Sequence, residues 1–329
     1  MPPKPFWLAL GFAGVLACCG LSIVIGVRVV SGADLLAGLS GSVENISQAA
    51  IAKRIPRTIM AALGGAALGL SGAVMQAITR NPLADPGILG VNAGAAFAVT
   101  LGIAWFGMAL SVTYVAVAIL GAALAAAFVY VVGSAGPGGA TPLKLALAGT
   151  ATSVALASLM NAVILGRNDI ANSVQYWMVG GVGGVTMDRV GLVAPFLALG
   201  FVLGAWTAPR LNSLALGDEL AAGVGENVAL TRAVSALGAV ILAGATTAIC
   251  GPIGFVGLAV PHMCRLIIGV DHRWLLPLSA FGGAILLLAA DVLGRVLVRP
   301  AELEVGIVTA LVGVPIFIII VRRQRVRDL

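Results

Sequence analysis

The sequence predicts an all-α, polytopic membrane protein, and three observations lead to that prediction. First, 60% of the 329 residues are hydrophobic and only 10% are charged, whereas a soluble domain carries about 25% charged residues. Second, the mean hydropathy is +1.08, and apolar runs of the roughly 20 residues needed to cross a bilayer recur along the whole chain. Third, 44 glycines suit helices that pack closely in lipid.

Polar breaks divide the chain into ten predicted transmembrane helices, each read from an apolar window of suitable length. These windows lie near 6–27, 56–79, 88–106, 110–133, 143–166, 190–208, 229–250, 254–268, 274–298 and 305–321. The first window begins behind Lys4 and contains a sequence resembling a lipoprotein cleavage box that ends at Cys18. Because the apolar run continues to about Val27, we interpret it as the first transmembrane helix.

The segments between the windows indicate how the chain turns. Glycine and proline cluster at 133–142, which predicts a turn, and the segment 167–189 is polar enough to predict a short interfacial helix and loop. The window 254–268 is short for a complete crossing. It predicts a helix broken at Gly251-Pro252, a feature tolerated where protein surrounds the break.

Basic residues predict the orientation, because short cytoplasmic loops are enriched in Lys and Arg. The C-terminus carries four arginines between 322 and 327, which indicates a cytoplasmic end. With ten spans, the N-terminus is then cytoplasmic as well.

This orientation places five basic residues on the outer face, against the usual bias: Lys53, Arg54, Arg57, Arg295 and Arg299. Such residues are costly to translocate, so we expect a function for them. Arginine recognises carboxylates well, which favours docking of an acidic external partner. Anchoring to lipid phosphates is the alternative.

Motifs for catalysis or ion coupling are missing from the sequence. No GxxxxGK[ST], GxSxG or HExxH pattern occurs, and the four cysteines lack metal-ligand spacing. An intramembrane hydrolase using His262 and a proton- or sodium-coupled secondary transporter therefore remain weaker alternatives. Asp291 and Arg295 lie four residues apart on one predicted helix, where they can pair with each other.

A mildly polar stripe runs along the window 143–166. It consists of Thr150, Ser153, Ala157 and Asn161, which recur at helical spacing. Such a face suits the wall of a wide pore for a bulky solute. The same hydroxyl groups could instead face neighbouring helices.

The segment 209–228 differs from the apolar windows around it. It reads as two short helices divided by Gly223 and Gly225, with Asp218 and Glu219 at the start of a helical stretch, where negative charge suits the helix dipole. We expect a compact cytoplasmic loop that docks a soluble subunit. A solvated loop without a partner is the alternative.

Ordered blocks along nearly the whole chain resemble the FecCD-type permeases, the membrane subunits of type II ABC importers for ferric siderophores, haem and cobalamin. The blocks are RIPRT at 54–58, SGAVMQ at 71–76, NPLADPGILG at 81–90, YWMVGGVGG at 176–184, LNSLALGDELAAGVG at 211–225, GPIGFVGLAVPHMCRL at 251–266, DHRWLLP at 271–277 and AELEVGIVTALVGVPIFI at 301–318. The resemblance implies a type II importer permease fold, with residues 1–329 forming one transmembrane permease domain.

The resemblance also implies roles for particular residues. Binding-protein docking falls to Arg54, Arg57 and Arg295. The ATPase-coupling segment comprises Leu214, Leu216, Gly217, Asp218, Glu219, Ala222, Gly223 and Gly225. The cytoplasmic gate comprises Asn81, Leu83, Thr141 and Pro142, although proline stands at 142 where such gates usually have a small polar residue. The pore lining comprises Thr150, Ser153, Ala157 and Asn161.

The implied assembly contains two permeases, identical or paralogous, two ATPase subunits and one external substrate-binding protein in the bacterial cytoplasmic membrane. This chain would be no enzyme and would hold no cofactor or metal, because ATP and Mg bind the partner ATPase. We expect a ferric siderophore as cargo, with haem or cobalamin as the alternative.

Overall fold

The computed structural model describes residues 2–27, 31–40, 44–87, 89–108, 111–135 and 141–325, and within those ranges its regular structure is entirely helical. The helices, in chain order, are α1 (Lys4–Val24), α2 (Gly32–Leu39), α3 (Ile46–Thr79), α4 (Val91–Phe106), α5 (Val112–Ser134), α6 (Pro142–Leu165), α7 (Asn168–Met178), α8 (Met187–Leu214), α9 (Asp218–Gly223), α10 (Val228–Cys250), α11 (Val256–Ile268), α12 (His272–Leu297) and α13 (Val305–Arg325). The all-α prediction is confirmed.

Each of the ten predicted windows corresponds to one helix, and α2, α7 and α9 are additional short helices. Seven helices of the described ranges are long and apolar enough to cross a membrane: α1, α3, α5, α6, α8, α10 and α12. The other three windows form shorter apolar helices, α4, α11 and the apolar part of α13. The structure therefore supports a polytopic membrane protein. Seven of the described helices are long and apolar enough to span the membrane.

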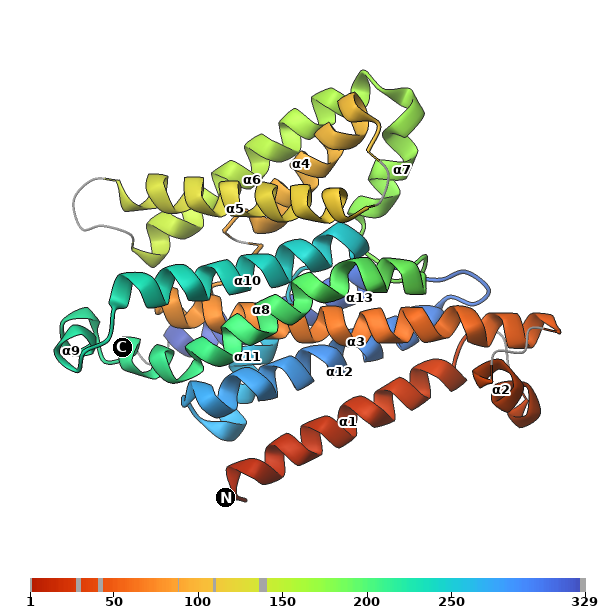
Figure 1. Cartoon of the computed structure of the whole chain (residues 1–329), viewed down its shortest axis with the longest axis horizontal. Coiled ribbons are helices and arrows are strands. Elements are labelled where there is room, and N and C mark those ends of the chain that lie inside the picture. The colour runs from red at the N-terminus through yellow and green to blue at the C-terminus, as the bar shows by residue number, and fades with distance from the viewer. Residues whose placement is uncertain are drawn as a thin grey trace.

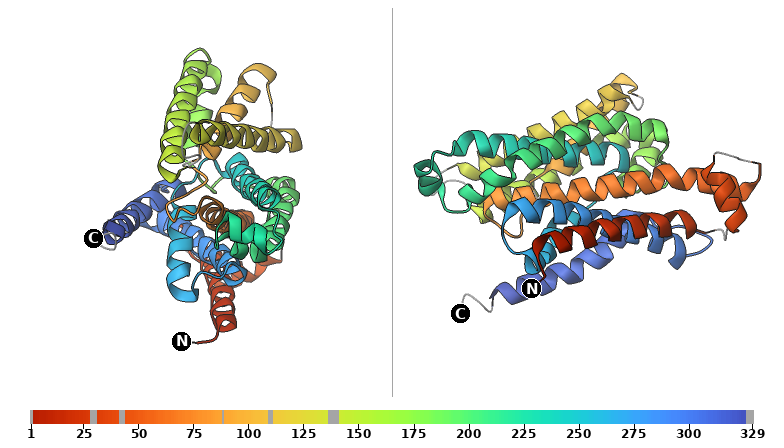
Figure 2. Two further views of the ribbon diagram at one scale, coloured as in Figure 1. Left: turned by 90° about the vertical axis from the view of Figure 1, so that its left-hand side faces the viewer. Right: turned by 60° about the horizontal axis from the view of Figure 1, so that its bottom comes forward.

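Helix α3 lies at the centre of the bundle and packs against α8, α10, α11 and α12 (Figure 1). Helices α4 to α7 form a separate group along one side, joined to the rest mainly through contacts of α10 with α4 and α5. On the opposite side, α1 packs along α12 and α3. Figure 2 shows the same arrangement from two other directions.

Helix α3 begins ten residues earlier than the sequence predicts. Asn45 caps its first turn, because the Asn45 side-chain oxygen accepts a hydrogen bond from the Gln48 amide at 2.9 Å. The predicted window began at residue 56, but Pro56 lies inside the helix. At 34 residues the helix is about 51 Å long, so it extends beyond the hydrocarbon core on at least one side.

Small residues allow α3 and α12 to cross closely. A methyl group added at Gly65 would lie 2.8 Å from the carbonyl carbon of Gly283 and 2.8 Å from Leu287 Cβ. Gly69 makes a similar approach to the backbone of Ser279. In lipid, such close backbone contact replaces the hydrophobic driving force that operates in water. This crossing fixes α12 against the central helix.

The break predicted at Gly251-Pro252 is confirmed, because α10 ends at Cys250 and α11 begins at Val256. Gly251 has φ 70°, a conformation that favours glycine. The Gly181 amide donates to the Cys250 carbonyl at 2.7 Å, so a loop of the protein itself covers the freed backbone group.

The two ends of the bundle are formed by different helices and helix ends. Helix α9, the start of α1 and the end of α13 lie towards one end (Figures 1 and 2). Helix α2 and the beginning of α3 lie at the other end. We call these the α9 end and the α2 end. The predicted site residues are divided between them.

Candidate functional site

A buried charge cluster at the α2 end surrounds Asp291 of α12, whose side chain is 0% exposed. Arg57 Nη2 lies 2.8 Å from Asp291 Oδ1, and Arg295 Nη2 lies 2.8 Å from Asp291 Oδ2. Arg57 also reaches Glu302 Oε2 at 2.7 Å. The predicted pairing of Asp291 with Arg295 is confirmed, and Arg57 and Glu302 extend it. The cluster thereby connects α3, α12 and the loop before α13.

Arginines also satisfy the carbonyl groups at the end of α1. A helix leaves its last carbonyls without partners inside the helix. Arg54 donates to the Ile23 and Val24 carbonyls at 2.9 and 3.0 Å, and Arg295 donates to those of Ser22 and Ile25 at 2.9 and 3.0 Å. Arg299 donates to the Gly26 carbonyl at 2.6 Å. These contacts tie the end of α1 to α3 and α12.

The three predicted docking arginines are thus turned inward in this structure. The exposed fraction is 7% for Arg54, 8% for Arg57 and 2% for Arg295. Their guanidinium groups contact Asp291, Glu302 and the α1 carbonyls rather than solvent. Lys53 and Arg299 are the exposed basic residues beside them. Direct docking through Arg54, Arg57 and Arg295 stays a prediction.

At the α9 end, the predicted coupling segment contains one separate helix rather than two. Helix α8 continues to Leu214, which is buried, and only α9 is independent. The reason lies in Gly217, whose φ of 109° ends the α8 turn and starts α9 directly. Gly225 has φ 87° and ends the segment before α10. Glu219, Ala222 and Gly223 lie exposed on α9.

An apolar face of this segment is open to the surroundings. Leu216 is 58% exposed, Leu220 63% and Val224 68%. Leu220 lies on α9, whereas Leu216 precedes its N-cap Gly217 and Val224 is its C-cap residue. Exposed apolar side chains of this size mark a surface for interaction with protein or membrane.

Asp218 fastens α9 to the rest of the bundle. Its carboxylate accepts hydrogen bonds from Arg232 Nη1 and Nη2 at 3.0 and 2.8 Å, and from Arg80 Nη2. Partial burial raises the pKa of the Asp218 carboxyl, but Arg232 and Arg80 outweigh this effect and hold that pKa below its ordinary value. The carboxylate is therefore charged at neutral pH.

Arg80 connects this anchor to the end of α3. It adopts φ 51° as the residue that caps α3, a conformation that is uncommon for a residue other than glycine. Its Nε and Nη2 atoms donate to the Leu214 carbonyl at 3.2 and 2.7 Å. The residue thus joins the end of α3, the end of α8 and the start of α9.

The turn predicted to form half of the gate follows Arg80 directly. Asn81 Oδ1 accepts from the Leu83 amide at 3.0 Å, and Asp85 Oδ1 accepts from the Gly87 amide at 2.7 Å. Asp85 is 7% exposed, and both Asn81 and Leu83 are half-buried. These side-chain bonds stabilise one shape of the turn, which directly follows the end of α3.

The other predicted gate residues begin α6. Thr141 is its N-cap, because Thr141 Oγ1 accepts from the Lys144 amide at 3.3 Å, and Pro142 occupies the first helical position, where proline is favoured. The side chain of Pro142 lies outside the described residues.

The predicted pore-lining stripe lies on the open side of α6. Thr150 and Asn161 are exposed, while Ser153 and Ala157 are half-buried. The same side carries Leu147 and Val154, which are 63% and 61% exposed. The stripe is therefore mixed polar and apolar, and it is available for a pore or for a second subunit.

Several contacts of the structure were not predicted from the sequence. Arg80 and Arg232 recognise Asp218 across 138 and 14 residues, and no local pattern announces them. Leu220 and Val224 could have been found, because they repeat the spacing of Leu216. At the α2 end, Tyr176 Oη donates to Glu304 Oε1 at 2.5 Å, which raises the pKa of the Tyr176 hydroxyl.

Together, these features define the class of protein to which the chain belongs. Long apolar helices surround a central helix, one end carries a buried charge cluster, and the other carries a small exposed helix tied to a structured turn. Within the described ranges, no group of three or more His, Cys, Asp or Glu side chains could hold a metal ion. The arrangement is that of a multi-span membrane permease.

The chain belongs to the FecCD transport family, whose model matches residues 14–323. It is 39% identical over 94% of its length to the ferric enterobactin transport system permease protein FepD of Escherichia coli, of which it covers 93%. It is 44% identical over 83% of its length to the iron(3+)-hydroxamate import system permease protein FhuB of Bacillus subtilis, of which it covers 71%. It is 40% identical to the hemin transport system permease protein HmuU of Yersinia pestis, over 83% of this chain and 82% of that protein.

The fold matches a solved structure as well. A chain from an inward-facing structure assigned to the metal-chelate type of ABC transporter superposes with a TM-score of 0.81. The match is 29% identical and covers 97% of this chain and 99% of that one. The predicted importer permease fold is confirmed.

Proposed function

We propose that this chain is the permease subunit of an ATP-driven ABC importer that carries a ferric siderophore across the bacterial cytoplasmic membrane. The observation that supports this most is the similarity to FepD over nearly the full length of both chains. Relatives named for iron hydroxamate and iron citrate point to the same kind of cargo. Haem is the second candidate, because of the similarity to HmuU.

The proposed complex contains a second permease, two ATPase subunits and an external substrate-binding protein. ATP and Mg bind the ATPase subunits. The α9 end and both termini face the cytoplasm. The exposed apolar face of Leu216, Leu220 and Val224 supports this orientation, since it offers a soluble ATPase a surface on which to dock.

The mechanism follows from the contacts at the α9 end. ATP binding draws the ATPase subunits together and displaces α9. Because Asp218 is bonded to Arg80, and Arg80 is the last residue before the turn at 81–87, the displacement reaches the gate turn and the end of α3. Two arrangements of the helices then alternate, and ATP binding favours one of them.

The path itself runs along the open side of α6. Its mixture of hydroxyl, amide and aliphatic groups lacks strong ligands for a chelate. This property suits a path that must release its cargo. At the α2 end, docking of the binding protein is assigned to the surface around Arg54, Arg57 and Arg295, with Lys53 and Arg299 as its exposed basic groups.

The test of the cargo is uptake by a strain that lacks this chain. Radiolabelled ferric siderophores, haem and cobalamin are supplied in parallel, and the intact gene is returned as the control. We expect selective loss of one ferric siderophore, restored by the gene. Loss of haem or cobalamin uptake alone would overturn the cargo and keep the class.

A further inference from the structure

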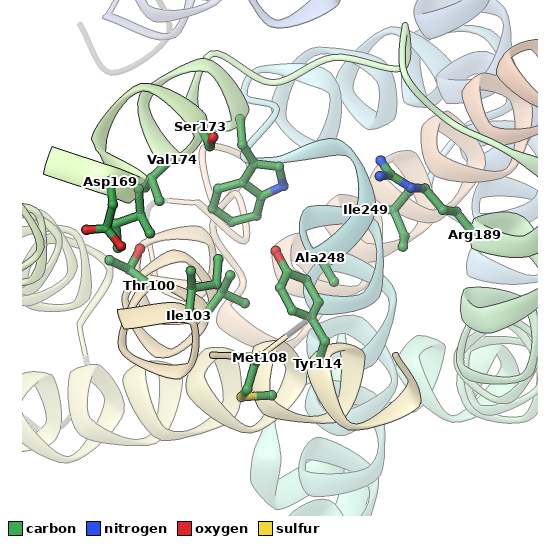
Figure 3. A pocket seen from close by; sticks show the side chains of 13 residues that line it. Thr100, Ile103, Met108, Tyr114, Asp169, Ser173, Val174, Arg189, Ala248 and Ile249 are labelled. Carbon is green, nitrogen blue, oxygen red and sulfur yellow. The ribbon is translucent and has the colours of Figure 1, made fainter. Parts of the chain in front are cut away.

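A cavity of about 340 Å³ lies between α4, α5, α7, α8 and α10 (Figure 3). Its volume falls within the range of about 300–1,000 Å³ that small-molecule sites occupy. Apolar side chains such as Val99, Ile103 and Ile249 form much of its wall. None of the functions proposed above uses it.

The lining of this cavity includes a buried hydrogen-bond donor that lacks a partner among the described residues. Trp177 Nε1 is buried and, among the described residues, has no hydrogen-bond partner. Tyr114 is 7% exposed, and Figure 3 shows its hydroxyl directed into the cavity, with Arg189 on one side and Asp169 on the other. A buried polar group without a partner is costly, so these donors indicate an acceptor that is supplied from outside.

The charges at the cavity favour an anion beside Arg189. Asp169 is neutralised by Arg167, whose Nε and Nη2 atoms donate to the two Asp169 carboxylate oxygens at 2.9 and 2.7 Å. No ion pair of Arg189 is found within the described ranges. Arg189 is half-buried and lies beside Asp188 in the first turn of α8. Its guanidinium group is therefore available to a ligand with an anionic group.

Exposed aromatic residues on α4 and α7, near the cavity, indicate which class of anion would bind there. Trp105 and Phe106 end α4 and are 66% and 80% exposed, and Tyr176 on α7 is 68% exposed. Exposed aromatic residues at helix ends mark the boundary between membrane and water. The cavity therefore opens at the depth of lipid headgroups, with an apolar wall suited to hydrocarbon.

We propose that this cavity binds an acidic phospholipid, with the headgroup phosphate on Arg189 and part of an acyl chain against the apolar wall. The Tyr114 hydroxyl and Trp177 Nε1 donate to headgroup or ester oxygens. This site is separate from the α6 path and from both clusters at the ends of the bundle. It does not depend on which cargo the transporter carries.

Native mass spectrometry of the full-length chain, extracted with its partner subunits, tests the proposal. Phosphatidylglycerol and phosphatidylcholine are offered as competing lipids. We expect preferential retention of phosphatidylglycerol. Arg189→Gln should reduce that retention about tenfold, because one charge-assisted contact is lost, whereas Arg189→Lys should keep part of it.

Two further variants separate the cavity from general charge effects. Ser173→Phe places a ring at the cavity from the exposed side of α7 and should also displace the lipid, without disturbing the core. Arg273→Gln removes an exposed arginine near the start of α12 and should leave retention unchanged.

Equal retention in Arg189→Gln and Arg273→Gln would overturn the proposal. Displacement of phosphatidylglycerol by millimolar inorganic phosphate would also overturn it, because the site would then bind a soluble anion rather than a lipid. If every variant retains both lipids to the same extent, the bound lipid is annular lipid only. That result would also overturn the proposal.

Discussion

Asp291 is the carboxylate shared by two arginines in the buried cluster at the α2 end. It lies fully buried between Arg57 and Arg295, and those two arginines in turn contact Glu302 and the last carbonyls of α1. A buried pair adds little over an apolar replacement of both partners, but removing one partner leaves uncompensated charge.

Asp291→Ala should therefore destabilise the protein by about 3–5 kcal/mol, because two buried guanidinium groups lose their carboxylate. The thermal unfolding midpoint in detergent is the measurement. Lys4→Ala is the matched control, because it removes an exposed pair with Asp271 and should cost less than about 1 kcal/mol. Equal midpoints for the two variants would show that the cluster is solvated.

The sequence predicted only the local part of this cluster. Asp291 and Arg295 are four residues apart, so their pairing follows from helix geometry. Arg57 lies 234 residues before Asp291, and such a contact depends on how α3 and α12 pack. For the same reason, the sequence grouped Arg54, Arg57 and Arg295 but did not predict that their side chains turn inward.

At the scale of elements, α3 connects both ends of the molecule. Its first half contributes Arg54 and Arg57 to the cluster at the α2 end. Its last turn ends at Arg80, which is bonded to α8 and α9. In the proposed mechanism, a displacement of α9 would reach the central helix through the Arg80 side chain.

Arg80→Ala should leave ATP hydrolysis in the complex largely intact while transport per ATP falls about tenfold, because a charge-assisted contact between α9 and the gate turn is lost. Parallel assays of hydrolysis and uptake in reconstituted vesicles measure this ratio. Arg273→Ala is the control. If Arg80→Ala transports as much substrate per ATP as the control, the displacement of α9 is not coupled to the gate turn through Arg80.

Gly65→Ala should destabilise the protein by about 1–3 kcal/mol, because its methyl group meets the backbone of Gly283, which has no rotamer with which to give way. Gly191→Ala on α8 meets nothing within 4 Å and should be neutral or slightly stabilising. The measurement is the thermal unfolding midpoint of each variant, compared with that of the unsubstituted protein. A neutral Gly65→Ala would mean that α3 and α12 are free to separate.

Asn161→Trp should slow uptake several-fold without loss of assembly, because a large ring would project from the open side of α6 into the proposed path. Leu124→Trp, on an exposed face of α5, is the control for added bulk. Uptake measured beside copurification of the ATPase separates the two effects. Normal uptake with Asn161→Trp would place the path elsewhere.

Helix boundaries show why the sequence predicts elements better than their ends. Apolar windows located ten helices, but the window for α3 began at residue 56, ten residues after the observed start at Ile46. Likewise, the segment 209–228 was predicted to form two short helices, whereas it contains one separate helix, α9. Both positions depend on φ angles and on a cap at Asn45, which hydropathy does not report.

For the whole molecule, the polytopic class and family were predictable because they depend on composition and on ordered blocks that cover most of the chain. The difference between the two ends of the bundle follows less directly from the sequence. The buried ionic cluster belongs to the α2 end, whereas the exposed apolar face of Leu216, Leu220 and Val224 belongs to the α9 end. This asymmetry is what an importer with different partners on each side requires.

Accumulation of a radiolabelled ferric siderophore in proteoliposomes tests the central claim most directly. The vesicles contain the permease and its ATPase, and binding protein and ATP are supplied on opposite sides. We predict accumulation only when ATP, ATPase and binding protein are all present. Accumulation driven by a proton or sodium gradient without the ATPase would contradict the account and identify a secondary transporter.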